Sequence, residues 1–318
     1  MKVLVFGLGA LGTVFSCLLK KKGHQVVGLD REPVLTAIRE HGVKVTGIWG
    51  EHTAQLDDLQ TSVEKLHERD FDLVILSVKS FDTEAITRQL AYVLNPETYL
   101  LLAQNGYGNY EAAARSIPEN RLILGRVIFG AETVNLGHSK VTVVADDVVI
   151  GSPGNLIPES ILESFARTIN EAGIPTRISN EVMKYLWGKI IYNSALNSLG
   201  AILEVNYGKL AENEHSRELM NRIIQEIFSL LQAMGQETLW PDAATYLQDF
   251  YAKLVPSTAS HHASMLQDIQ RGRRTEIEAL NGAVVALGKK YKVHTPVNVV
   301  ISTLVKTKER MVLQSPST

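Results

Sequence analysis

Residues 2–12 read KVLVFGLGALG, and this stretch decides the fold of the first half of the chain. The run 2–6 predicts a short buried strand, and glycines follow it at positions 7, 9 and 12. Mostly apolar residues continue to Leu19 and predict a helix that ends near Gly23, and residues 24–29 predict a second strand. The chain therefore begins with a strand, a glycine-rich turn, a helix and another strand.

The glycine spacing G-x-G-x-x-G in this context is typical of a dinucleotide-binding site. The first glycine permits the tight turn, the second lets the backbone approach a pyrophosphate, and the third allows close packing of helix on strand. The start of the helix adds N–H groups and a partial positive charge for the phosphates. The predicted cofactor-binding residues of this loop are Gly7, Leu8, Gly9, Ala10, Leu11 and Gly12.

Two charged residues follow the second strand, and they favour different cofactors. An acid such as Asp30 commonly accepts hydrogen bonds from the adenosine ribose of NAD, whereas Arg31 could pair with the additional phosphate of NADP. Both could also belong to a solvated turn before the helix predicted at residues 33–40. The spacing leaves the choice between NADP and NAD open.

Polar side chains stand at the predicted carboxyl ends of two further strands. Residues 73–78 predict an interior parallel strand that Lys79 closes, and residues 99–103 predict a strand that leads into Gln104, Asn105 and Gly106. Ligands of open α/β sheets collect outside the carboxyl ends of strands, so Lys79 and Asn105 are candidate contacts to a cofactor or an anionic substrate. A strand-end lysine and an Asn-Gly turn also have purely structural uses.

The remaining pattern predicts two domains. Residues 43–48 and 52–56 predict a small hairpin, and residues 173–179 predict a linker. We expect a Rossmann-type α/β domain over residues 1–179 and an all-α domain over residues 180–318. Further strands near residues 122–129, 140–144 and 148–151 are predicted to extend the sheet with an antiparallel end. The predicted helices of the second domain cover residues 181–199, 214–234, 243–254, 262–271, 276–291 and 297–310.

Composition excludes several classes of function. The formal net charge of −2 gives no basic surface for nucleic acid or an anionic membrane. Cys17 is the single cysteine, which rules out an internal disulfide, suits a reducing compartment and leaves no cysteine metal cluster. The apolar N-terminus imitates a secretory signal, but its three glycines and the lack of a cleavage pattern argue against one. We expect a soluble cytoplasmic protein.

The first helix of the second domain carries an unusual polar arc. Lys189, Asn193 and Asn197 fall within roughly 80° of one another on a helical wheel and lie among apolar neighbours. A lysine and two amides in such surroundings must reach water or find partners, because leaving them buried and unpaired costs several kcal/mol. The arc is either the wall of a wet pocket or a lysine that reaches the solvent at a domain edge.

A second polar patch lies between two helices of the same domain. It includes Ser264 and runs on to Thr275, Glu276 and Glu278. Thr275 and Glu278 have the spacing of a capping box, with the threonine before the helix and the glutamate three residues later. Glu276 is then left for another task, which is either binding or an interaction with the helix dipole.

Taken together, these motifs resemble those of the ketopantoate reductases (2-dehydropantoate 2-reductases), from the first strand to about Asn298. The resemblance implies a Rossmann domain, a helical domain, and NADPH-dependent reduction of ketopantoate to (R)-pantoate for pantothenate and coenzyme A synthesis. The segments that carry it are Gly7-Leu8-Gly9-Ala10-Leu11-Gly12, Val78-Lys79-Ser80, Gln104-Asn105-Gly106, Lys189 with Asn193 and Asn197, Ser264-Met265-Leu266-Gln267-Asp268, Thr275-Glu276-Ile277 with Asn281-Gly282, and Thr295-Pro296-Val297-Asn298.

The resemblance also implies roles for single residues. Lys189 would be the general acid and Glu276 the substrate-binding carboxylate beside it. Asp30 departs from the family pattern, because family members that prefer NADP often lack an acid there, so NAD stays open. The other implied roles are substrate orientation by Asn193, Asn197 and Ser264, contact to substrate and nicotinamide by Asn105, contact to cofactor or substrate by Lys79, and contact to the NADP 2′-phosphate by Arg31.

General chemistry agrees with these roles. Hydride delivery to a ketone leaves an alkoxide, and a lysine can both stabilise that charge and donate a proton. The nicotinamide carries the redox chemistry, so we expect no metal. The partner is a small 2-oxo acid, and a homodimer is compatible with the sequence. Two other readings are a reductase of a different 2-oxo acid, with Tyr107 or Tyr251 reshaping the pocket, and a non-catalytic NADP-binding sensor.

Overall fold

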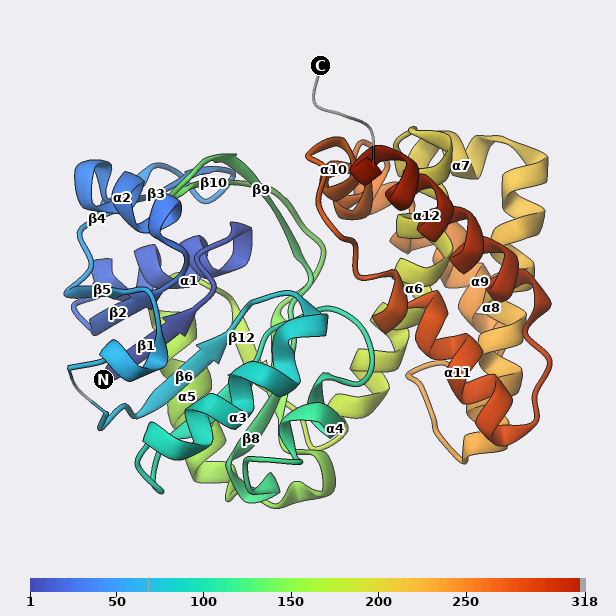
Figure 1. Cartoon of the computed structure of the whole chain (residues 1–318). Coiled ribbons are helices and arrows are strands. Elements are labelled where there is room, and N and C mark those ends of the chain that lie inside the picture. Colours follow the sequence, from blue (N-terminus) through green and yellow to red (C-terminus); the bar gives the residue numbers. More distant parts are fainter. Residues whose placement is uncertain (68, 315–318) are drawn as a thin grey trace. The chain divides into compact units, whose positions relative to one another are not determined.

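The computed structural model of the chain describes residues 1–67 and 69–314 (Figure 1). The chain forms two compact units, Met1–Val182 and Met183–Thr318, which we call unit 1 and unit 2. Unit 1 combines sheets with helices and the described part of unit 2 is helical, which confirms the predicted fold class. The domain boundary after residue 179 stays a prediction.

Unit 1 is built on an eight-stranded sheet with the order β12-β11-β8-β7-β6-β1-β2-β5. The six strands β8-β7-β6-β1-β2-β5 are parallel to one another. β11 runs antiparallel to β8, as expected for that end of the sheet. Its strands are β1 (Lys2–Phe6), β2 (Gln25–Leu29), β5 (Asp58–Gln60), β6 (Leu73–Leu76), β7 (Tyr99–Leu102), β8 (Leu122–Arg126), β11 (Val148–Gly151) and β12 (Thr176–Ile178).

Helices of unit 1 pack on this sheet through a buried apolar cluster. Val3 of β1 and Ile75 of β6 share the cluster with Phe15 and Ile169, which come from different helices. Burial of one such side chain contributes about 1.5–3 kcal/mol. Cys17 belongs to the cluster, and burial raises the pKa of its thiol to about 11. The helices are α1 (Ala10–Lys21), α2 (Glu32–His41), α3 (Thr83–Val93), α4 (Asn109–Ala113) and α5 (Glu159–Glu171).

A second, four-stranded sheet has the order β4-β3-β10-β9. It contains β3 (Val43–Gly47), β4 (His52–Ala54), β9 (Phe129–Asn135) and β10 (His138–Val144). The antiparallel pairing of β3 with β4 confirms the predicted hairpin. The expectation that the strand at 140–144 extends the main sheet was wrong, because β10 pairs with β3 instead (Figure 1). Buried Val45 and Val141 give both strands an apolar face that α1 covers.

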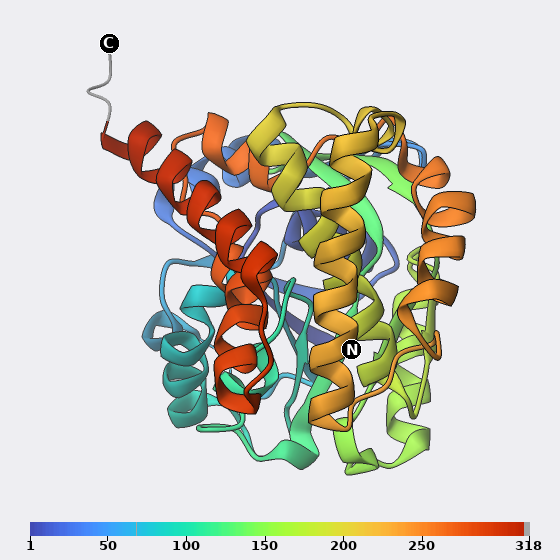
Figure 2. The same ribbon diagram turned by 90° about the vertical axis from the view of Figure 1, so that its right-hand side faces the viewer.

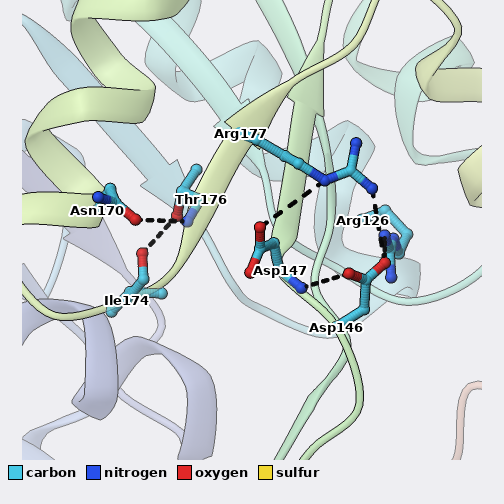
Figure 3. Close-up of polar contacts among 7 residues, drawn as sticks. All are labelled: Arg126, Asp146, Asp147, Asn170, Ile174, Thr176 and Arg177. Atoms are coloured by element: carbon cyan, nitrogen blue, oxygen red, sulfur yellow. Dashed lines mark hydrogen bonds and ion pairs between the residues drawn. The ribbon is translucent and has the colours of Figure 1, made fainter.

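The edge of the main sheet corrects another expectation. The predicted linker at 173–179 contains β12, which pairs in parallel with β11. Arg126, at the end of β8, is almost completely buried and binds the Asp146 carboxylate over 2.7 Å (Figure 3). Arg177 of β12 approaches the Asp146 and Asp147 carboxylates at 3.7 and 3.8 Å. These ion pairs hold together three strands of this edge.

In unit 2, helices follow one another through the described residues. The long helices α8 and α12 contact each other, and α11 packs against both (Figure 2). The described residues contain no helix with the length and apolar character needed to cross a bilayer. The helices are α6 (Val182–Leu203), which begins at the last residue of unit 1, α7 (Tyr207–Glu212), α8 (Glu214–Met234), α9 (Ala243–Asp249), α10 (Ser264–Gln270), α11 (Asn281–Tyr291) and α12 (Pro296–Gln314).

Candidate functional site

The glycine-rich loop of unit 1 has the geometry of a phosphate cradle. Gly7 has a φ of +94° and donates its N–H to the Leu29 carbonyl over 2.9 Å. A Cβ at Gly12 would lie 1.8 Å from the Gly7 carbonyl oxygen, so only glycine fits between α1 and the turn. Gly9 is exposed, and a Cβ there would meet no atom within 4 Å. The loop is therefore tightly packed between Gly7 and Gly12 and open to solvent at Gly9.

The start of α1 is available to an anion. Gly9 is the N-cap residue, and no side chain caps the helix. The first N–H groups of a helix lack partners within the helix, and the helix dipole places partial positive charge there. Open space at Gly9 and an uncapped helix start fit a pyrophosphate held by backbone N–H groups, which supports the predicted cofactor role of residues 7–12.

Asp30 and Arg31, at the end of β2, point to different tasks. One carboxylate oxygen of Asp30 accepts the Leu8 N–H over 2.6 Å, and the other accepts the Arg31 N–H over 2.7 Å. The Asp30 side chain is 15% exposed, whereas the Arg31 side chain is 82% exposed. Asp30 therefore stabilises the glycine-rich loop through the Leu8 N–H, and Arg31 extends into solvent.

Lys79 and Asn105 lie along the same edge of the main sheet. Lys79 follows β6 and is half-buried, and Asn105 follows β7 and is also half-buried. Because β2, β1, β6 and β7 are parallel neighbours, their carboxyl ends form one edge, with about 4.8 Å between adjacent strands. The chain leaves β1 toward β2 on one side and returns as β6 on the other, which is a topological switch point. The candidate residues of unit 1 therefore lie along one edge of the sheet.

The loop that carries Asn105 is braced by Gln104 and by two residues that the sequence analysis did not name, Thr83 and Asn109. Asn109 donates from its side-chain amide to the Asn105 carbonyl over 2.9 Å and accepts the Thr83 hydroxyl over 2.9 Å. Gln104 donates to the same hydroxyl over 2.6 Å. Gly106 has a φ of +86°, as the predicted turn requires. Asn105 is therefore held by a small buried polar cluster rather than by a free loop.

In unit 2, α6 carries the predicted polar arc. Lys189, Asn193 and Asn197 stand four residues apart on this helix, so each lies about one turn beyond the last. Asn193 and Asn197 are 8% and 5% exposed, and Lys189 is half-buried. Trp240 packs closely on α6 beside Lys189, because a Cβ at Gly188 would lie 2.9 Å from its ring. The arc is a nearly buried polar face.

Asn197 and Ser264 are brought together directly. The Asn197 side-chain nitrogen donates to the Ser264 hydroxyl over 3.1 Å, and its oxygen accepts the Met265 N–H over 3.1 Å. No side chain from its own N-cap residue, Ala263, caps α10, so Asn197 caps this helix from α6. The amide thereby fixes the hydroxyl of Ser264 beside the polar face.

The segment around Glu276 differs from the predicted capping box. The structure has a 3-10 turn at Ile277–Ala279 before α11 instead of one helix from residue 276. Glu278 does not cap a helix, because its carboxylate binds Lys306 over 2.7 Å. Thr275 donates both its N–H and its hydroxyl to Glu309, over 2.8 and 2.7 Å. Glu276 is half-buried between these two fixed residues.

Tyr251, one of the two tyrosines considered for pocket shape, is engaged by α8. Its hydroxyl donates to the Asn221 side-chain oxygen over 2.8 Å, and the Arg217 guanidinium lies 3.9 Å from its ring centre. These contacts give Tyr251 a structural partner on α8. They do not favour a role in selecting the substrate.

The glycine-rich loop and the switch point of unit 1 are typical of one class of protein, the dinucleotide-binding oxidoreductases. A family model described as "Ketopantoate reductase PanE/ApbA" matches residues 3–155, and its companion, "Ketopantoate reductase PanE/ApbA C terminal", matches residues 181–309. The chain belongs to the ketopantoate reductase family, as the motifs of the sequence indicated.

Individual relatives support this membership. A 2-dehydropantoate 2-reductase of Aquifex aeolicus is 49% identical over 312 residues, which are 97% of each chain. The structure of a 2-dehydropantoate 2-reductase from Geobacter metallireducens is similar with a TM-score of 0.85 and 26% identity, over 96% of this chain and 99% of that one. A D-mandelate dehydrogenase solved with NADH and anilino(oxo)acetate is similar with a TM-score of 0.88 and 26% identity, over 98% and 99% of the two chains.

Proposed function

We propose that this protein reduces 2-dehydropantoate to (R)-pantoate with NADPH, a step toward pantothenate and coenzyme A. The observation that carries the proposal is the polar face of α6, where Lys189, Asn193 and Asn197 share one side and Asn197 holds Ser264. The 49% identity to a 2-dehydropantoate 2-reductase over nearly the whole chain supports the choice of substrate. The expected cytoplasmic location and homodimer stay predictions.

Proton donation is the proposed task of Lys189. A bound reduced nicotinamide would supply the hydride to the ketone carbon of the substrate. As that hydride arrives, the carbonyl oxygen gains negative charge, and the Lys189 ammonium would stabilise this charge and donate a proton to the oxygen. A lysine on a nearly buried face is suited to this role, because a low local dielectric strengthens its interaction with the developing alkoxide.

Substrate orientation is the proposed task of the neighbouring groups. Asn193 and Ser264 would donate to the substrate carboxylate without adding a competing charge, and Asn197 would hold Ser264 in place. Glu276 would accept a hydrogen bond from the substrate hydroxyl and hold the Lys189 ammonium in its charged form.

NADPH is the proposed cofactor because of the contrast between Asp30 and Arg31. Both carboxylate oxygens of Asp30 already accept backbone N–H groups. The Arg31 side chain is 82% exposed, with its Nε 3.9 Å from the Asp30 carboxylate, and its guanidinium would pair with a 2′-phosphate. Residues 7–12 would hold the pyrophosphate, and Lys79 and Asn105 would contact the cofactor farther along the same edge. Asn105 would also reach the substrate.

A panel of substrates and cofactors tests this function. 2-Dehydropantoate, 2-oxo-2-phenylacetate and pyruvate would each be supplied with NADPH or NADH, and the absorbance of the reduced cofactor followed. We expect the highest kcat/KM with 2-dehydropantoate and NADPH. A higher value for 2-oxo-2-phenylacetate would favour the second candidate, a reductase of another 2-oxo acid, which the similarity to the D-mandelate dehydrogenase suggests.

A pair of lysine variants tests the mechanism. Lys189→Ala should lower kcat by about 10²- to 10⁴-fold while NADPH still binds, because general acid catalysis contributes that much. Lys209→Ala is the matched control, since Lys209 is an exposed lysine of the same unit that pairs with Glu212. Equal kcat values for both variants would remove Lys189 from the mechanism. If the wild type binds NADPH but reduces none of the 2-oxo acids, the alternative of a non-catalytic NADP-binding sensor is favoured.

A further inference from the structure

A buried polar network joins four helices of unit 2 at Asn281, the first residue of α11. The Asn281 side-chain oxygen accepts the Ser198 hydroxyl over 2.5 Å, and its nitrogen donates to the Ser194 carbonyl over 3.1 Å and to the Asn298 oxygen over 3.0 Å. Asn298 of α12 in turn donates to the Glu226 carboxylate of α8 over 2.8 Å. Neither Asn281 nor Asn298 is exposed to solvent. The proposed chemistry uses none of these residues.

The network contacts α6 directly beside the proposed reactive face. Ser194 follows Asn193 in the chain, and Ser198 follows Asn197, so the two serines form a stripe about 100° around the helix from the amides. Asn281 holds this stripe at two successive turns, once at a carbonyl and once at a hydroxyl. Such a two-point contact fixes both the rotation and the axial position of α6.

Asn281 also ends the segment that carries Glu276. Thr275, on the other side of Glu276, is bound twice to Glu309 of α12. Leu280, between the 3-10 turn and α11, has a φ of −109° and a ψ of −109°. These angles are not helical, so the backbone turns here and the segment is not one continuous helix. Because Asn281 binds Asn298 and Thr275 binds Glu309, both ends of the segment are attached to α12.

We propose that Asn281 and Thr275 are positioning residues that hold α6, with its general acid, and the Glu276 segment in register on α12. This inference rests on the function proposed above for Lys189 and Glu276. A buried amide that satisfies three partners at once keeps one geometry, because a shift of any helix would leave a buried polar group without its hydrogen bond. Misplacement of reacting groups by about 1 Å can cost about 100-fold in rate.

The first test uses Asn281→Ala with a control that lowers stability by another route. Ile224→Ala removes a buried aliphatic side chain of α8, which cannot take part in the hydrogen bonds of the network, and leaves a cavity. Both variants are compared with the wild type in melting temperature, NADPH Kd, kcat and KM for 2-dehydropantoate, and the pH profile of kcat. We expect Asn281→Ala to lose about 10- to 100-fold in kcat with an unchanged NADPH Kd, and Ile224→Ala to keep kcat at a similar melting temperature.

The pH profile separates positioning from general destabilisation. If the positions of Lys189 and Glu276 depend on Asn281, the pH profile of kcat changes in Asn281→Ala and keeps its wild-type shape in Ile224→Ala. Equal kcat losses in Asn281→Ala and Ile224→Ala, or a wild-type pH profile in Asn281→Ala, would overturn the proposal. A wild type that does not reduce 2-dehydropantoate contradicts the proposed function instead, and the comparison is then made with the 2-oxo acid that it reduces best.

A second pair keeps the test decisive if Asn281→Ala does not fold. Thr275→Val removes the hydroxyl that binds Glu309 but keeps the shape and the N–H contact, and Thr275→Ser retains the hydroxyl. We expect Thr275→Val to raise the KM for 2-dehydropantoate and lower kcat, and Thr275→Ser to restore both toward wild-type values. Identical kinetics of these two variants would contradict the positioning role of Thr275.

Discussion

The backbone N–H of Leu8 donates to the Asp30 carboxylate over 2.6 Å, so the acid at the end of β2 supports the glycine-rich loop from within the protein. Such a bond to a charged acceptor contributes about 1.5–3 kcal/mol. An acid at this position usually indicates NAD, but here Asp30 stabilises the glycine-rich loop, whichever cofactor binds there.

Asp30→Asn should therefore weaken NADPH and NADH binding by similar factors. In Asp30 the Leu8 and Arg31 N–H groups each bind their own carboxylate oxygen. The asparagine amide has only one acceptor oxygen, so the loop loses part of its support. Arg31→Ala is the control and should weaken NADPH alone. Titration of cofactor fluorescence gives the four Kd values. Tighter NADPH binding together with weaker NADH binding in Asp30→Asn would instead identify Asp30 as a ribose ligand.

Gly12→Ala and Gly9→Ala should fail in different ways. The new Cβ at position 12 would collide with the Gly7 carbonyl, so we expect a loss of about 3 kcal/mol or more in the free energy of unfolding. The Cβ at position 9 meets open space, so that variant should fold normally and lose cofactor affinity, because the methyl group would occupy the space that we propose for the pyrophosphate. Thermal melts and cofactor titrations distinguish the two, and a stable Gly12→Ala would contradict the packing argument.

Asn197→Ala should affect stability and catalysis, whereas Ser264→Ala should affect catalysis alone. Loss of the Asn197 side chain leaves the Met265 N–H and the Ser264 hydroxyl without this partner, at a cost of about 1–2 kcal/mol typical of a lost helix cap. Ser264→Ala leaves the bond to Met265 in place, and should raise the KM for the 2-oxo acid at an unchanged melting temperature. A normal melting temperature in Asn197→Ala would show that it does not act as the cap.

Asp146 should make the sheet edge sensitive to acid. Burial acts to raise the pKa of its carboxyl, but hydrogen bonds from Arg126 and the Asp147 N–H, with the charges of Arg126 and Arg177, together outweigh burial and lower the pKa (Figure 3). A lowered folded-state pKa means that the stabilisation is complete above the unfolded-state pKa of about 3.9 and is lost as the pH falls through the lower folded-state value.

Asp146→Asn should lower the melting temperature at neutral pH, because the buried Arg126 guanidinium loses its 2.7 Å ion pair with the Asp146 carboxylate. We expect about 1–3 kcal/mol, reduced from the value for fully buried pairs because the Asp146 side chain is 45% exposed. The difference from wild type should be constant above about pH 5 and shrink below about pH 4. Asp147→Asn, which removes only a 3.8 Å contact with Arg177, is the matched control. If the difference in stability between Asp146→Asn and the wild type persists at low pH, this ion pair is not its cause.

The sequence predicts the part of the fold that local patterns specify. The glycine-rich loop and the parallel strands at 2–6 and 73–76 follow from glycine spacing and apolar runs, and the shared carboxyl edge then places Lys79 and Asn105. The pairing of β3 with β10 was missed, because a short alternating strand does not indicate which distant strand it joins. The predicted capping box was wrong because the Thr275 hydroxyl and the Glu278 carboxylate bind Glu309 and Lys306 of α12, and no local spacing indicates those partners.

The site was predicted by residue type and not by the bonds among its residues. Lys189, Asn193 and Asn197 follow from helical spacing, but the capping of α10 by Asn197 joins residues 67 and 68 positions apart. The bond between the Thr83 hydroxyl and the Asn109 side chain, which braces Asn105, joins residues 26 positions apart, and no local pattern indicates it. These contacts depend on tertiary packing.

The turn between Glu276 and Asn281 has a consequence for how the family can diverge. Its two ends are attached to the same helix, so an added or deleted residue would displace the carboxylate or detach the asparagine. An alignment of active relatives should therefore show this interval at constant length. The length of one short turn would then separate working reductases from relatives that have drifted to other tasks.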